Sequence, residues 1–72
     1  MANEIPYSGV VDIDANALTL TYLGLIAVAD NYESGSLGEA SLIEAQRLVE
    51  VEMRAQHGDE AWTTMRAAAG RD

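Results

Sequence analysis

The strongest pattern in the chain is an apolar segment without a charged side chain, residues 16–29 (NALTLTYLGLIAVA). Apolar residues recur along it at alternating spacings of four and three, as on one face of a helix: Leu18, Tyr22, Leu25, Ala29 and Tyr32. The opposite side also carries large apolar side chains: Leu20, Leu23, Ile26 and Val28. The pattern predicts a helix over about residues 15–32 that must be covered on more than one side.

An extended conformation is the alternative for the first part of this segment. Residues 18–22 (LTLTY) alternate leucines with threonines, so they could pair with residues 10–13 as a β-hairpin. The alternation stops after Tyr22, whereas the helical spacing continues, and the helix is therefore favoured. Gly24 lies inside this helix at a cost of about 1 kcal/mol relative to alanine. We expect it to allow another helix to approach closely.

A second helix is predicted over about residues 37–56. Ser36 and Glu39 match the S-x-x-E capping box at its start, and Gly58 is placed to end it with a left-handed backbone. Its predicted core face consists of Leu42, Ala45, Leu48, Val49 and Met53.

The other sides of this helix suggest a further packing surface. Glu50 and Arg54 are four residues apart in the favourable order, which predicts an ion pair between them. Ile43 and Val51 fall outside the core face, and Glu52 lies near that face, where an unpaired carboxylate is costly. A second surface packed against this helix would account for these positions.

The ends of the chain are shorter elements. Residues 1–14 predict an extended N-terminal arm, and Asp14 is placed to cap the first helix. Residues 59–69 predict a short third helix with acids in its first turn, and residues 70–72 a frayed end. We expect Trp62 to join Met53 and Met65 in a core instead of an exposed binding face. The predicted fold is all-α, a small helical hairpin plus a short C-terminal helix in a single domain.

Length and charge narrow the classes of partner. The 72 residues contain twelve acids against four arginines, for a net charge of −8. Such a chain is repelled by nucleic acids and by anionic membranes. A chain this small without cysteine is close to the lower limit for a self-sufficient core, so we expect self-association or a larger assembly. The apolar segment is too short to span a membrane, and no signal peptide is expected; the chain is expected to be cytoplasmic or part of a soluble assembly.

No motif predicts catalysis or a cofactor. Residues 12–16 (DIDAN) match the start of a calcium-binding loop, but Ala17 and Leu23 occupy the positions that require glycine and glutamate. His57 has no cysteine or second histidine beside it to complete a zinc site. No nucleophile motif or phosphate-binding loop is present. We therefore expect no enzymatic activity, no metal and no cofactor.

Protein–protein contact is the function that remains. The expected interface of a self-associating assembly subunit consists of Leu18, Tyr22, Gly24, Leu25, Ile26, Ala29, Ile43 and Val51. The alternative is an acidic inhibitor or decoy, as some phage-encoded inhibitors are, that binds a basic protein surface. Its expected contacts are Glu39, Glu44, Glu50, Asp59 and Glu60.

Overall fold

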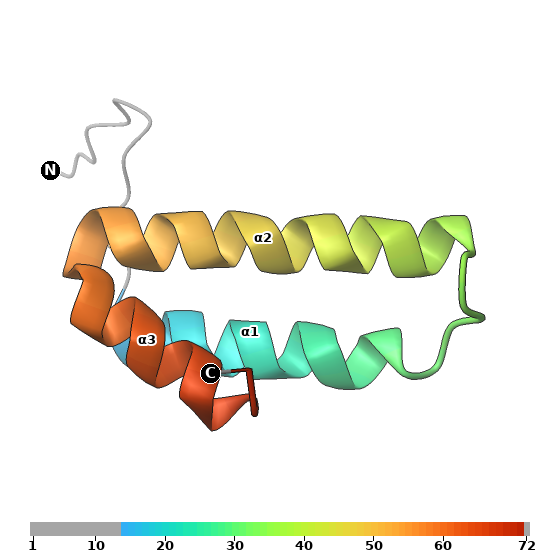
Figure 1. The fold of residues 1–72 in the computed structure, drawn as a ribbon. Helices are drawn as coiled ribbons and strands as arrows, with labels where there is room; N and C mark the ends of the chain where they lie inside the picture. Colours follow the sequence, from blue (N-terminus) through green and yellow to red (C-terminus); the bar gives the residue numbers. More distant parts are fainter. Residues whose placement is uncertain (1–13, 72) are drawn as a thin grey trace, which may run out of the picture.

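The chain folds as three helices, in a computed structural model that describes residues 14–71. The helices are α1 (Ala15–Ala29), α2 (Leu37–His57) and α3 (Asp59–Ala68). Figure 1 shows α1 and α2 as an antiparallel hairpin, with α3 lying across one end of it. The predicted all-α class and the hairpin with a short third helix are confirmed, and residues 18–22 are helical. Apart from Asp14, the predicted N-terminal arm lies outside the described residues.

The first helix begins as predicted but ends earlier. The Asp14 carboxylate accepts a hydrogen bond of 2.6 Å from the Asn16 amide, which caps the first turn. The helix ends at Ala29, where the Tyr32 amide donates to the Ala29 carbonyl at 3.1 Å. A bond spanning three residues belongs to a turn tighter than the α-helix, so Tyr32 lies outside the helix, and its predicted place on the apolar face was wrong.

Glycines shape the two connections between the helices. A Cβ added at Gly38 would collide with the Tyr32 ring, so the glycine lets that ring pack on the first turn of α2. Gly58 has a φ of 94°, which only glycine adopts easily, and it joins α2 directly to α3. This sharp connection folds α3 back onto the hairpin.

The capping box at the start of α2 is confirmed in its first half. The Glu39 amide donates to the Ser36 hydroxyl at 3.1 Å. The Glu39 carboxylate accepts from the Gly35 amide at 2.7 Å instead of the expected Ser36 amide. One carboxylate therefore ties the loop to the helix one residue earlier than the motif predicts.

The core lies at the end of the hairpin that α3 covers. Its buried side chains are Leu18, Tyr22, Met53 and Met65, each at most 4% exposed. Trp62 is half-buried and packs against this cluster, so the prediction that it joins Met53 and Met65 in a core is confirmed. No buried polar side-chain atom in the described residues lacks a hydrogen-bond partner.

One predicted core position of α2 is wrong. Leu48 is 60% exposed, whereas Gln46, which the sequence did not indicate, is 3% exposed. The other predicted positions turn inward: Met53 is buried, and Leu42, Ala45 and Val49 are half-buried. The inward side of α2 therefore follows Gln46, Val49 and Met53 and leaves Leu48 outside.

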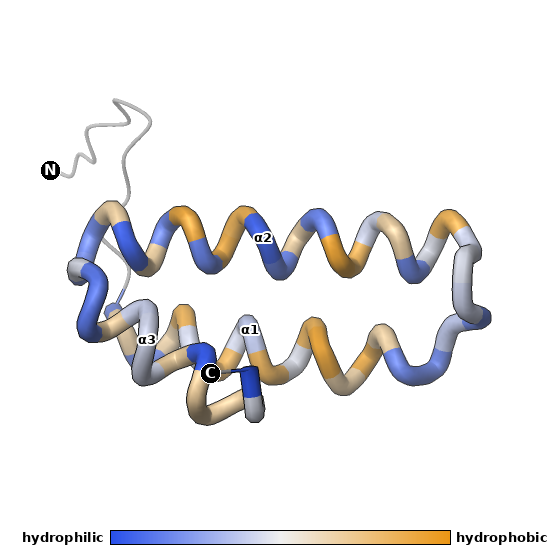
Figure 2. The backbone as a smooth tube through the Cα atoms, in the orientation of Figure 1, coloured by the Kyte–Doolittle hydropathy of each residue, from blue (hydrophilic) through white to orange (hydrophobic). Residues whose placement is uncertain are grey.

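Hydropathy separates the two long helices. In Figure 2, α1 is pale to orange over nearly its whole length, whereas α2 alternates between orange and blue. None of the helices in the described part of the chain has the length and hydropathy needed to cross a lipid bilayer.

Candidate interaction surface

The most unusual surface of the described residues is the side of α1 that points away from α2 and α3. We call this the outer face of α1; its members are all exposed and none is charged: Ala17, Leu20, Thr21, Gly24, Ala27 and Val28. Leu20 is 70% exposed and Val28 is 45% exposed. The positions are three or four residues apart, so they form one continuous stripe along the helix. Neither α2 nor α3 covers this stripe of the uncharged helix.

The outer face has few side-chain polar groups that would need hydrogen bonds to water. Its only hydroxyl, on Thr21, donates to the Ala17 carbonyl of its own helix at 2.8 Å. Burying the face would therefore leave no donor of a side chain unsatisfied, which keeps the desolvation cost low. A Cβ added at Gly24 would meet no atom within 4 Å. Among residues 14–71, nothing occupies the space beside Gly24, and neither α2 nor α3 uses the close approach that the glycine allows.

Exposed apolar side chains also occur on α2, in a different setting. Ile43, Leu48 and Val51 are 47%, 60% and 59% exposed. The ion pair between Glu44 and Arg47, 3.4 Å long and exposed, lies among them. The apolar positions of α2 are thus interrupted by charge, whereas those of the outer face of α1 are not.

The predicted interface residues divide into three groups. Leu18 and Tyr22 belong to the core of the chain itself and are not available at the surface. Leu25, Ile26 and Ala29 are half-buried against the rest of the hairpin. The exposed members are Gly24, Ile43 and Val51. Leu20 and Val28, the large exposed side chains beside Gly24, were not among the predicted interface residues. Their spacing of four residues from Gly24 is visible in the sequence, but the sequence alone did not show which of the two apolar sides of α1 would turn inward.

Tyr22 is the centre of a polar cluster at the edge of the core. Its hydroxyl donates to the Glu50 carboxylate and accepts from Arg71 Nη1 at 3.0 Å. Arg66 Nη1 lies 3.1 Å from the same Glu50 oxygen, and Arg71 Nη1 lies 3.9 Å from it. Residue 71, expected to be frayed, is therefore held by this cluster.

The cluster shifts the pKa of both its acids. Burial, followed by the hydrogen bond to Glu50, raises the pKa of Tyr22 above its usual value. For Glu50, burial acts to raise the pKa, but the Tyr22 hydrogen bond and the charge of Arg66 outweigh it, and its pKa lies below the usual value. The cluster thus holds a neutral tyrosine against an ionised glutamate and joins all three helices.

The predicted ion pair between Glu50 and Arg54 was wrong. Arg54 Nε instead lies 2.6 Å from Asp59, and its guanidinium carbon lies 4.2 Å from the centre of the Trp62 ring. Arg66 also approaches this ring, at 5.3 Å. Asp59 and Trp62 both belong to α3, which the turn at Gly58 brings against α2. Arg54 therefore interacts with a different helix and not with the neighbouring turn of its own helix.

Most of the acids proposed to contact a basic partner already interact with other groups of this chain. Glu50 and Asp59 are paired with arginines of this chain, and Glu44 with Arg47. Glu39 accepts from the loop backbone at Gly35, and Glu60 is exposed. Four of the five carboxylates therefore already have a partner within this chain.

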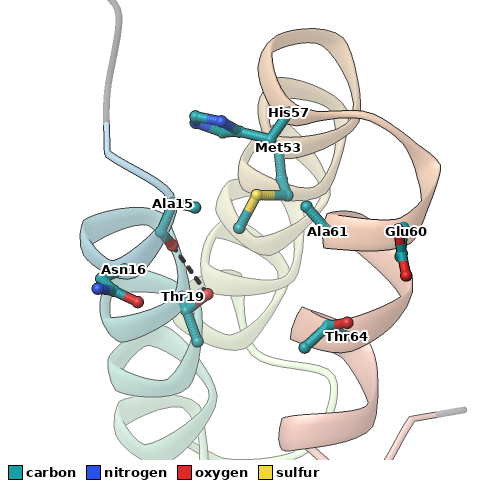
Figure 3. Close-up of a pocket in the computed structure, with 8 residues that line it drawn as sticks. All are labelled: Ala15, Asn16, Thr19, Met53, His57, Glu60, Ala61 and Thr64. Carbon is teal, nitrogen blue, oxygen red and sulfur yellow. Dashed lines mark hydrogen bonds between the residues drawn. The ribbon is translucent and has the colours of Figure 1, made fainter.

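A groove of about 380 Å³ lies between the start of α1, the end of α2 and α3 (Figure 3). It is lined by Ala15, Asn16, Thr19, Met53, His57, Glu60, Ala61 and Thr64. The Thr19 hydroxyl donates to the Ala15 carbonyl at 2.9 Å, so it does not point a free donor into the groove.

Within residues 14–71, no three His, Asp or Glu side chains gather closely enough to hold a metal ion. Asp14, from the calcium-like segment, serves as the cap of α1.

Comparison of the chain with protein-family models, with curated proteins and with solved structures gives no match. The exposed surface of the three helices is therefore the basis for a functional proposal.

Proposed function

We propose that this protein is a small, acidic, non-enzymatic interaction subunit that self-associates through the outer face of α1. The observation that carries the proposal is an exposed, uninterrupted, uncharged stripe on a chain whose net charge is −8. Exposed apolar stripes of this kind mark interaction sites more often than single exposed apolar residues do. The apolar first helix needs a cover on its second side, and a partner protein supplies it.

The charge distribution allows a second copy as the partner only along α1. Two copies of this chain repel each other wherever acidic surfaces meet. Helix α1 has no Asp, Glu, Lys or Arg between Ala15 and Ala29, so contact along it places no like charges directly against each other. Burial of a leucine contributes about 1.5–3 kcal/mol, and a twofold dimer buries Leu20 twice.

The test is the mass of the protein in solution, measured by light scattering after size exclusion at micromolar to hundred-micromolar concentration. The wild type is expected to show a mass above that of one chain, rising with concentration. Leu20→Glu is expected to return it to a monomer, because each copy then carries a carboxylate into the contact.

Leu48→Glu is the matched control, since it changes a leucine of similar exposure by the same charge on α2. It is expected to leave the mass unchanged. A wild type that stays a monomer throughout the concentration range would overturn the proposal. Equal loss of association in both variants would show that added charge and not the outer face of α1 is responsible.

The acidic inhibitor or decoy is the alternative, with Glu44, Asp59 and Glu60 the exposed members of its proposed contacts. It predicts association with a basic protein that weakens steeply as salt is added. Self-association through an uncharged face instead persists or strengthens at high salt. A salt titration of the mass therefore separates the two functions.

A further inference from the structure

We propose that two copies pair their α1 helices antiparallel, with the twofold axis at Gly24, so that Leu20 of each copy packs on Val28 of the other. This arrangement rests on the proposed self-association and specifies its geometry. In an antiparallel twofold contact, a residue that lies a given number of positions before the axis faces the residue that lies the same number of positions after it in the other copy. With the axis at Gly24, position 20 therefore faces position 28, and position 21 faces position 27.

The shape of the outer face fits this register. Gly24 is exposed and has empty space beside it, so at the axis the two helix backbones can approach closely. The two large side chains, Leu20 and Val28, lie one turn to either side of the glycine. They fill the space that opens on each side of the axis, while small residues meet at the centre.

The charges of the rest of the chain favour the antiparallel direction. The end of the hairpin near the α1–α2 loop carries four acids: Asp30, Glu33, Glu39 and Glu44. The opposite end, where α3 packs, is also acidic but less so, with three arginines (Arg54, Arg66 and Arg71) against five acids (Asp14, Glu50, Glu52, Asp59 and Glu60). Parallel pairing would bring the two most acidic ends together, whereas antiparallel pairing places each beside the less acidic end of the other copy and so lowers the repulsion. The helix dipoles also oppose each other favourably only in the antiparallel pair.

Cross-linking tests the register directly, because the natural chain contains no cysteine. Leu20→Cys and Val28→Cys are prepared separately, one with a tag of different mass, and a short thiol-to-thiol cross-linker is added to each variant alone and to their mixture. The mixture is expected to give a heterodimer band at least tenfold faster than either variant alone. Val51→Cys, on the exposed side of α2, is the control and is expected to give no band.

Gly24→Ala supplies an independent measurement. The added methyl meets nothing in the monomer, so the fold is retained, but at the axis two methyl groups oppose each other. Overpacking of a close contact is expected to weaken the dimer about tenfold, measured by light scattering or sedimentation.

The outcomes separate this geometry from the self-association on which it rests. If Leu20→Cys alone cross-links as fast as the mixture, the helices are parallel and the inference is wrong, although α1 still mediates the contact. If the wild type is a dimer but none of the three cysteine variants cross-links, another surface is used. If the wild type is a monomer, the proposed function and the pairing both fail.

Discussion

The two ends of the hairpin differ in how completely their helices are covered. The covered end is defined by α3 and the parts of α1 and α2 that it contacts, and it holds the four apolar side chains that are buried among residues 14–71. At the open end, toward the α1–α2 loop, Val28, Tyr32 and Ile43 are between 45% and 48% exposed. The polar cluster around Tyr22 and Glu50 lies at the border between them.

This difference shows what the third helix contributes. Two antiparallel helices bury one stripe each, and a small hairpin of this kind leaves most apolar side chains partly in water. The ten residues of α3 convert one end into a closed core, with Met65 as the buried side chain that they add. The open end and the outer face of α1 keep apolar surface that the three helices leave exposed.

Truncation of a core methionine is expected to have the largest effect on stability. Met65→Ala should lower the free energy of unfolding by about 2–5 kcal/mol, because it leaves a cavity where the three helices meet. Leu42→Ala, at the half-buried open end, should cost only about 1 kcal/mol, since water already reaches that side chain. Urea denaturation followed by circular dichroism measures both. Equal losses would contradict the division into a covered and an open end.

The border cluster predicts the next largest effect. Glu50→Gln removes the charge that Arg66 and Tyr22 share and should cost about 1–3 kcal/mol, because its side chain is only 18% exposed. Glu44→Gln on the same helix breaks an exposed pair with Arg47 and should cost less than about 0.5 kcal/mol. Urea midpoints compare the two variants. A cost for Glu44→Gln as large as that for Glu50→Gln would show that the cluster adds nothing beyond a surface pair.

The pH dependence follows from the same cluster. The lowered pKa of Glu50 contributes stability that is present above its ordinary value of 4.5 and is lost as the pH falls through the lower, folded value. The raised pKa of Tyr22 contributes stability that is present below 10.0 and is lost as the pH rises through the higher, folded value. Thermal midpoints of the wild type and Glu50→Gln should therefore converge at strongly acidic pH. A constant difference down to about pH 2 would argue against an ionised Glu50 in the cluster.

The smallest effects are expected at two helical glycines. Gly24→Ala should raise the stability of the monomer by about 1 kcal/mol, because helix propensity improves and the methyl group meets no neighbour. Gly38→Ala should gain less or nothing, since its methyl group collides with the Tyr32 ring and displaces it. Unfolding at concentrations below the onset of association measures both. A loss of stability in Gly24→Ala would show that the space beside α1 is filled within one chain.

The sequence by itself determined the helices and most of their ends. Asp14 and Ser36 cap α1 and α2, and Gly58 ends α2, because caps and periodicity depend on hydrogen bonds and side chains within one or two turns. The proposed surface depends on the absence of charge in α1, and this absence is read directly from residues 15–29 of the sequence. These features need no knowledge of the rest of the fold.

The tertiary structure alone decided which sides of the helices face inward. Either of the two apolar sides of α1 could have faced the core; packing against α2 and α3 buries Leu18 and Tyr22 and leaves Leu20 exposed. The tertiary packing also leaves Leu48 of α2 exposed and gives Glu50 a partner sixteen residues away in Arg66. These outcomes depend on how the three helices lie against one another, and the spacing of residues within one helix does not contain that information.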